Sequence, residues 1–405
     1  MQPTEIADNC DSMVKPMESM MKPREQFRPD DVHAYLKEIF AGDVHAKRVL
    51  SLAKATTGVL TSGSLAVAAI GQGMAHTCGT RTKHAVKQVD RLVGNDRVDV
   101  WDYFRLWVPH VVAEREHVMV ALDWTDFARD GHQTVSLNLL TSHGRAIPLV
   151  WRTVESRGLK GHRNEYEDSV LRRLRETLPE GVCVTVIADR GFFDVELLEV
   201  LRDCWGFGYV VRMRGNIQVA SASGETRSAA EWVGAGGRAR TLRGAKLTQA
   251  GFEVPTVVCT KAKGMKEPWC LAVSDAEAKA AEVVKHYARR WSIECYFRDT
   301  KDLRFGMGMD AIHTKSPARR DRLFLLSALA IVLLTLLGAA CEKVGYDRYL
   351  KANTVKTRTH SLFRQGLMVY ELMPNMREGD LTPILEAFAE ALHAHRATST
   401  LFAAV

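Results

Sequence analysis

The sequence predicts an α/β fold in which a core built around a sheet lies between helical regions at both ends of the chain. Between residues 116 and 213, apolar runs of strand length alternate with helical patterns in the order β-β-β-α-β-α-β. Residues 31–95 and 323–405 carry mainly helical patterns. With 405 residues, the chain is long enough for two or three domains and a sizeable core.

The composition is that of an ordinary soluble globular protein, with 46% hydrophobic and 25% charged residues. The net charge of +7 is compatible with nucleic-acid binding but does not require it, and the basic residues gather in residues 81–97, 285–304 and 315–322. The eight cysteines have no zinc-site spacing, which indicates buried thiols in a reducing compartment. The polar, acidic N-terminal residues do not resemble a secretory signal.

The helical region that precedes the core contains a basic helix. Residues 1–30 are polar and contain four prolines, so we expect a flexible arm. Residues 31–98 then combine short amphipathic helices, a stretch rich in alanine and glycine, and a basic helix that ends at Gly94. This pattern is consistent with a DNA-binding domain of the helix-turn-helix type. It is equally consistent with a small helical bundle that has a solvated basic face.

Two aspartates close predicted strands of the core. The strands are expected at residues 118–123, 134–140, 146–151, 182–188 and 207–213, with helices at residues 165–177 and 195–204. Asp123 closes the first strand and Asp189 closes the fourth. If these strands are neighbours, the two carboxylates meet at the edge where sites form in open α/β sheets. Taken singly, each aspartate is more often a turn or cap residue, and Asp126 and Asp194 are nearby alternatives.

A β-rich segment and a striped helix follow the fifth strand. Residues 214–275 contain alternating runs separated by glycines, which predict an inserted β-rich subdomain. One helix is then expected over residues 286–304, and Tyr287, Arg290, Glu294 and Lys301 fall within an arc of roughly 60° on it. Arg298 joins this row. The alternative is a solvated face held by ion pairs between residues four apart.

Three carboxylates therefore gather around the predicted sheet edge. Carboxylate oxygens suit Mg²⁺, and two such ions can cleave a phosphodiester without a serine, cysteine or histidine nucleophile. The chain contains no nucleophile-elbow, phosphate-loop or zinc-protease motif that would indicate another mechanism. The candidate metal ligands and catalytic residues are Asp123, Asp189 and Glu294.

The chain resembles the cut-and-paste DDE transposases of bacterial insertion sequences, and within them the insertion-sequence-four family. The signature of that family, Tyr-x2-Arg-x3-Glu-x6-Lys, is matched at every spacing by Tyr287, Arg290, Glu294 and Lys301. Residues 121–127 (ALDWTDF) and 187–192 (IADRGF) resemble the blocks around the family's two aspartates. The resemblance extends over roughly residues 80–322, and it is weaker at the basic N-terminal helix.

The resemblance implies a ribonuclease-H-like catalytic core over residues 116–322, interrupted by the insertion at 214–275. It implies cleavage of transposon ends and transfer to target DNA, with Mg²⁺ as cofactor and Mn²⁺ as an alternative. Asp123, Asp189 and Glu294 would hold the metal, and the basic row would hold DNA through Tyr287, Arg290, Arg298 and Lys301. Excision in this family can pass through a hairpin with a flipped base held by an aromatic side chain. Trp232, Trp269 and Trp291 are candidates here, against the alternative that all three are core residues.

The resemblance also implies partners and a location. Double-stranded DNA, as transposon ends and target, would be bound by a homodimer in the bacterial cytoplasm, at the nucleoid. The helices of residues 323–405 would serve dimerisation or cap their own protomer. An alternative function is a DNA-binding protein derived from a transposase that no longer cleaves.

One apolar segment raises a third interpretation. Residues 323–340 contain no charge, and Arg319, Arg320 and Arg322 precede them, as at the cytoplasmic end of a membrane span. A helix buried in a large core has the same pattern. We expect the buried helix and no membrane partner, because the segment stands alone in a basic protein and follows the signature helix closely.

Overall fold

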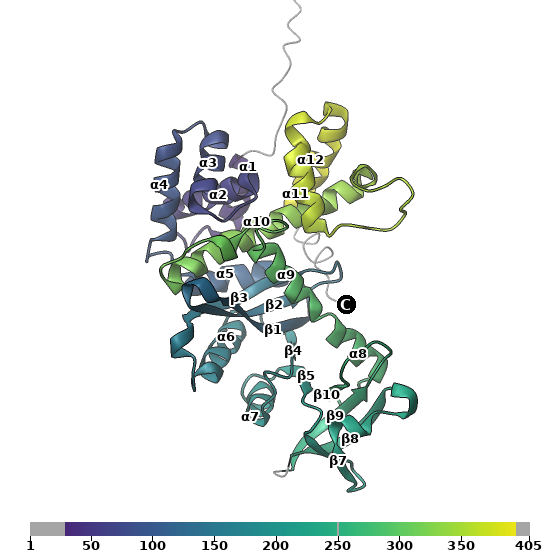
Figure 1. The fold of residues 1–405 in the computed structure, drawn as a ribbon. Coiled ribbons are helices and arrows are strands. Elements are labelled where there is room, and N and C mark those ends of the chain that lie inside the picture. The colour runs from purple at the N-terminus through teal and green to yellow at the C-terminus, as the bar shows by residue number, and fades with distance from the viewer. Residues whose placement is uncertain (1–28, 249–250, 394–405) are drawn as a thin grey trace, which may run out of the picture.

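The computed structural model describes residues 29–248 and 251–393. Residues 1–28, which make up nearly all of the predicted flexible arm, lie outside the described residues. Within the described part, one ten-stranded sheet has the order β3-β2-β1-β4-β5-β10-β9-β8-β6-β7. Helices precede, cover and follow this sheet (Figure 1), so the predicted α/β class is correct.

The first five strands form the mixed half of the sheet. They are β1 (His117–Phe127), β2 (His132–Leu140), β3 (Ala146–Glu155), β4 (Cys183–Ala188) and β5 (Gly208–Met213). The first three form an antiparallel meander, and β4 and β5 run parallel to β1. Parallel neighbours need crossover connections. Here the crossovers are α6 (Arg163–Thr177) and α7 (Val195–Glu199), the latter continued by a π-helical turn (Val200–Cys204).

The first strand is longer than predicted. The sequence analysis ended it at Asp123, but β1 continues to Phe127 because its antiparallel pairing with β2 runs from Val120 opposite Leu139 to Phe127 opposite His132. Its parallel pairing with β4 stops earlier, at Leu122 opposite Ala188. Asp123 therefore marks the end of one ladder and not the end of the strand.

The β-rich segment after residue 213 extends the same sheet. Its strands are β6 (Gln218–Ala220), β7 (Thr226–Ser228), β8 (Arg240–Leu247), β9 (Phe252–Thr260) and β10 (Trp269–Val273). The last of these pairs antiparallel with β5, which joins the two halves of the sheet. The predicted β content is therefore present, and its strands continue the core sheet. That this segment is an inserted subdomain stays a prediction.

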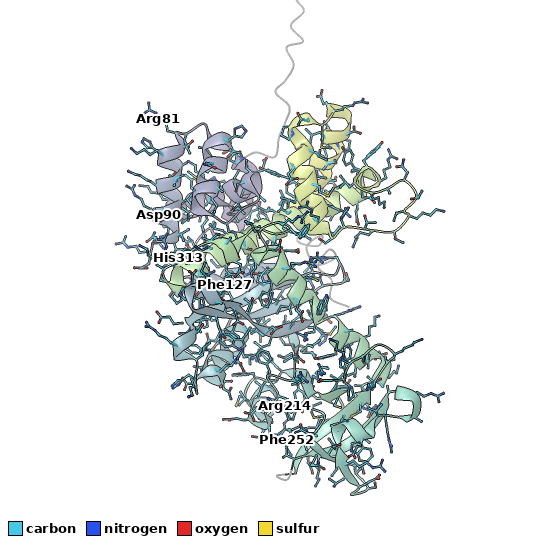
Figure 2. All side chains as sticks on the ribbon, in the orientation of Figure 1. Arg81, Asp90, Phe127, Arg214, Phe252 and His313 are labelled. Atoms are coloured by element: carbon cyan, nitrogen blue, oxygen red, sulfur yellow. The ribbon has the colours of Figure 1, made fainter. Side chains whose placement is uncertain are left out.

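From residue 29, where the described part of the chain begins, five helices precede the sheet, and the sequence analysis missed the fifth. They are α1 (Pro29–Phe40), α2 (Ala46–Ser62), α3 (Val67–Cys78), α4 (Thr82–Val93) and α5 (Val100–Val112). Gly71 of α3 packs so close to α4 that a Cβ there would lie 2.5 Å from Val86. Figure 2 shows Arg81 at the outer end of α4, and Asp90 nearer the body of the molecule. Asp90 pairs with Arg319 at 2.6 Å, which ties α4 to the first turn of α10.

The apolar segment forms the centre of α10 (Pro317–Lys343), a helix long and apolar enough to cross a membrane. The whole of its apolar window is buried within the fold. It packs against β3, α2, α11 (Leu362–Leu372) and α12 (Glu378–His393), and Figure 1 shows it between the strands and the outer helices. The expected buried helix is therefore what the structure contains.

Candidate active site

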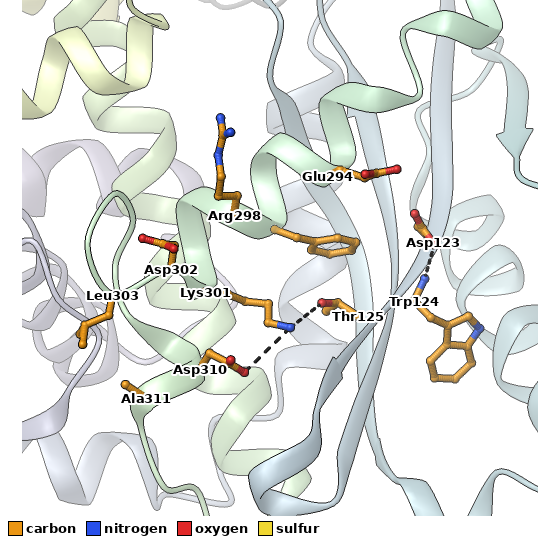
Figure 3. Close-up of a pocket in the computed structure, with 11 residues that line it drawn as sticks. Asp123, Trp124, Thr125, Glu294, Arg298, Lys301, Asp302, Leu303, Asp310 and Ala311 are labelled. Atoms are coloured by element: carbon orange, nitrogen blue, oxygen red, sulfur yellow. Dashed lines mark hydrogen bonds and ion pairs between the residues drawn. The ribbon is translucent and has the colours of Figure 1, made fainter. Parts of the chain in front are cut away.

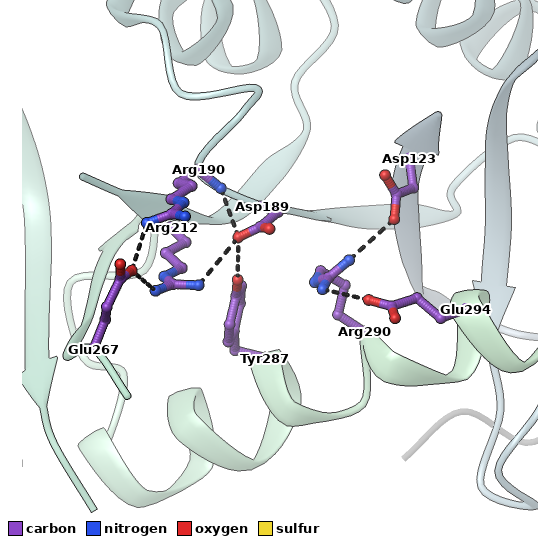
Figure 4. A network of polar contacts seen from close by, with 8 residues as sticks. All are labelled: Asp123, Asp189, Arg190, Arg212, Glu267, Tyr287, Arg290 and Glu294. Atoms are coloured by element: carbon purple, nitrogen blue, oxygen red, sulfur yellow. Dashed lines mark hydrogen bonds and ion pairs between the residues drawn. The ribbon is translucent and has the colours of Figure 1, made fainter. Parts of the chain in front are cut away.

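The register of β1 and β4 sets Asp123 and Asp189 side by side. Leu122 lies opposite Ala188 in the last parallel pair, and each aspartate is the next residue along the chain. Each side chain also accepts a hydrogen bond from the following backbone amide. Asp123 Oδ1 accepts from Trp124 N at 2.9 Å, and Asp189 Oδ1 accepts from Arg190 N at 2.7 Å. The sequence analysis expected Asp123 and Asp189 to meet only if the first and fourth strands are neighbours. They are neighbours, and the two aspartates lie side by side (Figure 4).

The helix expected over residues 286–304 is two helices. They are α8 (Ala280–Ala288) and α9 (Trp291–Lys301), so the prediction of one continuous helix is wrong. Between them, the amides of Arg289, Arg290 and Ser292 bond to carbonyls three residues back, at 2.9–3.1 Å. Such bonds are tighter than those of an α-helix and break its regular angular spacing. The row of side chains is consequently divided, with Tyr287 on α8 and Glu294 on α9.

Tyr287 and Arg290 connect the helices to the strand carboxylates, as Figure 4 shows. The Tyr287 hydroxyl donates to Asp189 Oδ1 at 2.9 Å. The Arg290 guanidinium lies between two acids, with Nη1 3.0 Å from Asp123 Oδ2 and Nη2 2.9 Å from Glu294 Oε1. The Arg290 side chain is only 13% exposed, so this bridge is shielded from water. Five of the sequence-predicted site residues thus make polar contacts with one another, in two neighbouring groups (Figure 4).

Lys301 and Arg298 lie further along α9, beside a cavity of about 630 Å³. Lys301 Nζ donates to Thr125 Oγ1 at 3.2 Å and to the Asp126 carbonyl, and its exposed neighbour Asp310 is 3.9 Å away (Figure 3). Arg298 is exposed and lines the same cavity. Both residues therefore face the cavity that also contains Asp123 and Glu294, and neither contacts Asp189.

The sequence analysis missed two arginines, Arg190 and Arg212, beside Asp189. Arg212 Nη1 lies 3.5 Å from Asp189 Oδ1, and its Nη2 lies 3.2 Å from Glu267. Arg190 also pairs with Glu267, so one glutamate holds two arginines at this edge of the site. A signal was present for Arg212, because it is a charged residue within the otherwise apolar strand predicted at residues 207–213. Glu267 came from a loop 55 residues further along the chain, and no local pattern indicated it.

The two aspartates differ in electrostatic environment. Burial raises the pKa of Asp123 to about 6, against the lowering effect of Arg290, and the negative charges of Glu294 and Asp189 add to the rise. Burial also acts to raise the pKa of Asp189. There the Arg190 amide, Arg290, Tyr287 and Arg212 outweigh it, so its pKa lies below the usual value. The network thus stabilises the charge of one carboxylate more than that of the other.

The donors fit a hard divalent cation in chemistry, because three carboxylates supply oxygen ligands. Across residues 29–248 and 251–393, however, no three acidic, histidine or cysteine side chains lie close enough together to hold an ion. The Arg290 guanidinium lies between Asp123 and Glu294 and offsets part of their negative charge. A cation that used both carboxylates would have to take the place of this guanidinium.

Comparison with known proteins gives the family. Residues 115–333, more than half of the chain, match the model of the Transposase DDE domain. The chain belongs to the DDE transposases. No curated protein matches it. The matched residues run from just before β1 into α10, so they contain the sheet and the whole carboxylate network, and they leave α1–α5, α11 and α12 outside.

A buried glutamate supports the first aspartate of this DDE transposase, and the sequence analysis did not single it out. Trp124, the residue after Asp123, donates its indole N–H to Glu167 Oε1 at 2.7 Å. The Arg163 guanidinium lies 4.8 Å from the centre of the same indole ring. Burial raises the pKa of Glu167 to about 7, although the Trp124 hydrogen bond and Arg163 lower it. Glu167 therefore positions Trp124, and through it the backbone that carries Asp123.

The three candidate tryptophans of the transposase have different surroundings. Trp232 is 1% exposed and donates to the Val219 carbonyl at 3.0 Å, as a core residue does. Trp269 is half-buried and packs edge-on against Tyr287 with ring centres 4.8 Å apart. Trp291 is 63% exposed at the start of α9. The ring of Trp269 therefore contacts a residue of the site, whereas Trp232 is a core residue.

Proposed function

We propose that this chain cuts DNA at the ends of an insertion sequence and joins those ends to target DNA. Asp123, Asp189 and Glu294 are its metal ligands in this proposal, with Mg²⁺ as the ion and Mn²⁺ as an alternative. The observation that carries the proposal is the β1–β4 register, which sets two carboxylates side by side next to a third on α9. A family of phosphoryl-transfer enzymes provides the reaction class.

When bound, divalent ions would activate the attacking water or hydroxyl and stabilise the leaving oxygen. The chain's own side chains bind and orient DNA around them. Tyr287 holds Asp189 in place through its hydroxyl, and burial raises the pKa of this phenol, so it remains a donor at neutral pH. Arg298 and Lys301 face the cavity with cations suited to backbone phosphates. Arg290 would exchange its carboxylate partners for a phosphate when the metal enters.

At a finer level, we assign the chain to the insertion-sequence-four family on the spacing of Tyr287, Arg290, Glu294 and Lys301. Excision through a hairpin then needs an aromatic side chain that holds a flipped base. Trp269 is favoured for this role, since its contact with Tyr287 brings it next to Asp189. Arg190 and Arg212 flank the same carboxylate and would add phosphate contacts.

The proposal assigns end recognition to the N-terminal helices. Four basic side chains, on α4 and at its start, support it, because they are exposed and a basic helix face is suited to DNA: Arg81, Lys83, Lys87 and Arg91. A homodimer on double-stranded DNA, in the bacterial cytoplasm at the nucleoid, remains part of the proposal. The packing of α11 and α12 on α10 of their own chain favours a capping role for these helices. Light scattering of the DNA complex tests the dimer.

The test is a cleavage assay on DNA that carries the sequences flanking the reading frame. We expect cuts at the ends with Mg²⁺ and none with chelator. Glu294→Gln should bind the ends and lose cleavage by at least about a hundred-fold, because it removes a metal ligand and keeps the basic side chains. Glu282→Gln, an exposed glutamate on neighbouring α8, is the matched control and should cut like the wild type.

Other outcomes point elsewhere. Specific binding without cleavage by the wild type would favour the DNA-binding protein that has lost catalysis. Normal cleavage by Glu294→Gln would contradict the assignment of this ligand.

A further inference from the structure

The loop that follows α9 presents two large apolar side chains to solvent. Leu303 is 74% exposed and Phe305 is 56% exposed, with the exposed Arg304 between them. A single exposed apolar residue is ordinary, but neighbouring ones on one short loop indicate an interaction surface. We call residues 302–308 the α9 loop.

The α9 loop is held firmly by its own backbone. Asp302 Oδ1 accepts from the amides of Arg304 at 2.8 Å and Phe305 at 2.6 Å. The amide of Met307 donates to the Asp299 carbonyl at 2.8 Å. Gly306 packs so closely on the end of α9 that a Cβ would lie 2.3 Å from the Asp299 oxygen. Leu303 and Phe305 are therefore carried on an ordered loop, and their exposure is built into its conformation.

The α9 loop lies between the carboxylates and the N-terminal helices. Leu303 lines the cavity that contains Asp123 and Glu294, and Figure 3 places Leu303 and Asp123 at opposite ends of it. On its other side, the Met307 carbonyl accepts a hydrogen bond from Leu65 N at 2.9 Å, in the connection between α2 and α3. DNA held by the N-terminal helices would pass over this loop to reach the carboxylates.

Cations lie beside the exposed apolar side chains of the loop, in a cavity that acidic residues also line. Arg298 and Lys301 line the cavity, and the Arg304 guanidinium lies 5.2 Å from the Phe305 ring centre. Cations beside exposed apolar and aromatic side chains are suited to DNA, because the cations contact phosphates while the apolar groups contact base faces.

We propose that Leu303 and Phe305 form a wedge that enters the DNA stack at the end of the cavity opposite Asp123. Their insertion separates neighbouring base pairs, so that the scissile strand can bend into the cavity towards Asp123 and Glu294. This inference rests on the proposed function and adds to it a deformation of the substrate. Apolar wedges that unstack a base step are an established means of kinking a duplex.

The test uses duplexes that carry the flanking DNA, with 2-aminopurine at successive positions around the cut. The wedge variant is Leu303→Ser with Phe305→Ser. The matched control is Leu372→Ser with Tyr349→Ser, which removes an exposed leucine and an exposed aromatic ring from the C-terminal helical region. Wild type and control should increase 2-aminopurine fluorescence at one or two positions on binding. The wedge variant should bind within about three-fold of wild type, lose this increase, and cleave at least ten-fold more slowly.

A mismatch at the same position supplies the second measurement. DNA that is already unpaired there should restore cleavage by the wedge variant to within about three-fold of wild type. Equal fluorescence in wild type and wedge variant, or no rescue by the mismatch, would overturn the wedge. A switch from dimer to monomer on light scattering, with the fluorescence increase retained, would assign the loop to a contact with a second copy and also overturn it. If the wild type neither binds nor cuts these duplexes, the proposed function itself fails, a result distinct from the others.

Discussion

Arg290 is the residue on which the state of the active site depends. Its guanidinium contacts Asp123 at 3.0 Å and Glu294 at 2.9 Å, in the space between two proposed metal ligands. A metal ion must therefore compete with a shielded, charge-assisted pair. We expect Arg290→Ala, without DNA, to bind Mn²⁺ about ten-fold more tightly than wild type, because the ion no longer has to displace the guanidinium. A ten-fold change in Kd corresponds to about 1.4 kcal/mol of binding free energy. Titration calorimetry measures it, and Arg298→Ala is the control, because Arg298 is an exposed cation on the same helix. Unchanged Mn²⁺ affinity in Arg290→Ala would show that the guanidinium does not compete.

Glu167 gives the structure a pH dependence that can be isolated. Burial raises its pKa to about 7, so the folded chain keeps a proton there that the unfolded chain releases near its ordinary pKa of about 4.3. The contribution of protonated Glu167 to the free energy of unfolding is therefore fully present below about pH 4.3. It is lost as the pH rises from there through about 7. We expect Glu167→Gln, which keeps an acceptor for Trp124, to gain about 3 kcal/mol in unfolding free energy relative to wild type between pH 4.5 and 8. Urea unfolding at both pH values tests this, with the exposed Glu165→Gln as control. Parallel pH profiles of Glu167→Gln and wild type would contradict the prediction.

At the scale of helices and strands, the sequence predicted the elements that a local residue pattern determines. It missed the features that depend on contacts with other elements of the fold. The lengths of the apolar runs located the strands of the mixed half, and the ends of two of these runs located Asp123 and Asp189. The extension of β1 to Phe127 comes from hydrogen bonds supplied by β2, which no local pattern contains. Helix α5 was missed because its β-branched and aromatic residues and Pro109 have low helix propensity. Its packing on β3 compensates, including a hydrogen bond from Trp107 Nε1 to the Pro148 carbonyl at 2.8 Å.

Two glycines allow α10 and α11 to pack closely. A Cβ at Gly366 would lie 1.8 Å from the Leu334 carbonyl oxygen, and one at Gly338 would lie 1.9 Å from that of Leu362. Because both obstacles are backbone atoms, Gly366→Ala must separate the helices, and we expect a loss of about 2–3 kcal/mol in unfolding free energy. Gly379 in α12 has open space around its Cβ position, so Gly379→Ala should be neutral or stabilising by up to about 1 kcal/mol. Urea unfolding compares the two, and equal stability of both variants would show that the close contact does not constrain α10 and α11.

For the whole molecule, α10 connects the sheet that carries Asp123 to both helical regions. Its first turns hold the N-terminal region, because the buried Arg322 donates to the carbonyls of Val98 at 2.7 Å and Val93 at 3.0 Å. Its apolar window is completely buried by β3, α2, α11 and α12. A lipid-exposed span would forfeit this packing and leave those partners with uncovered apolar faces. We therefore expect alkaline extraction of a membrane fraction to release the chain, while a single-span protein added as control stays in the pellet. Retention of the chain with the membranes would overturn the role of α10 as the core helix, and with it the contacts that place the N-terminal helices beside the active site.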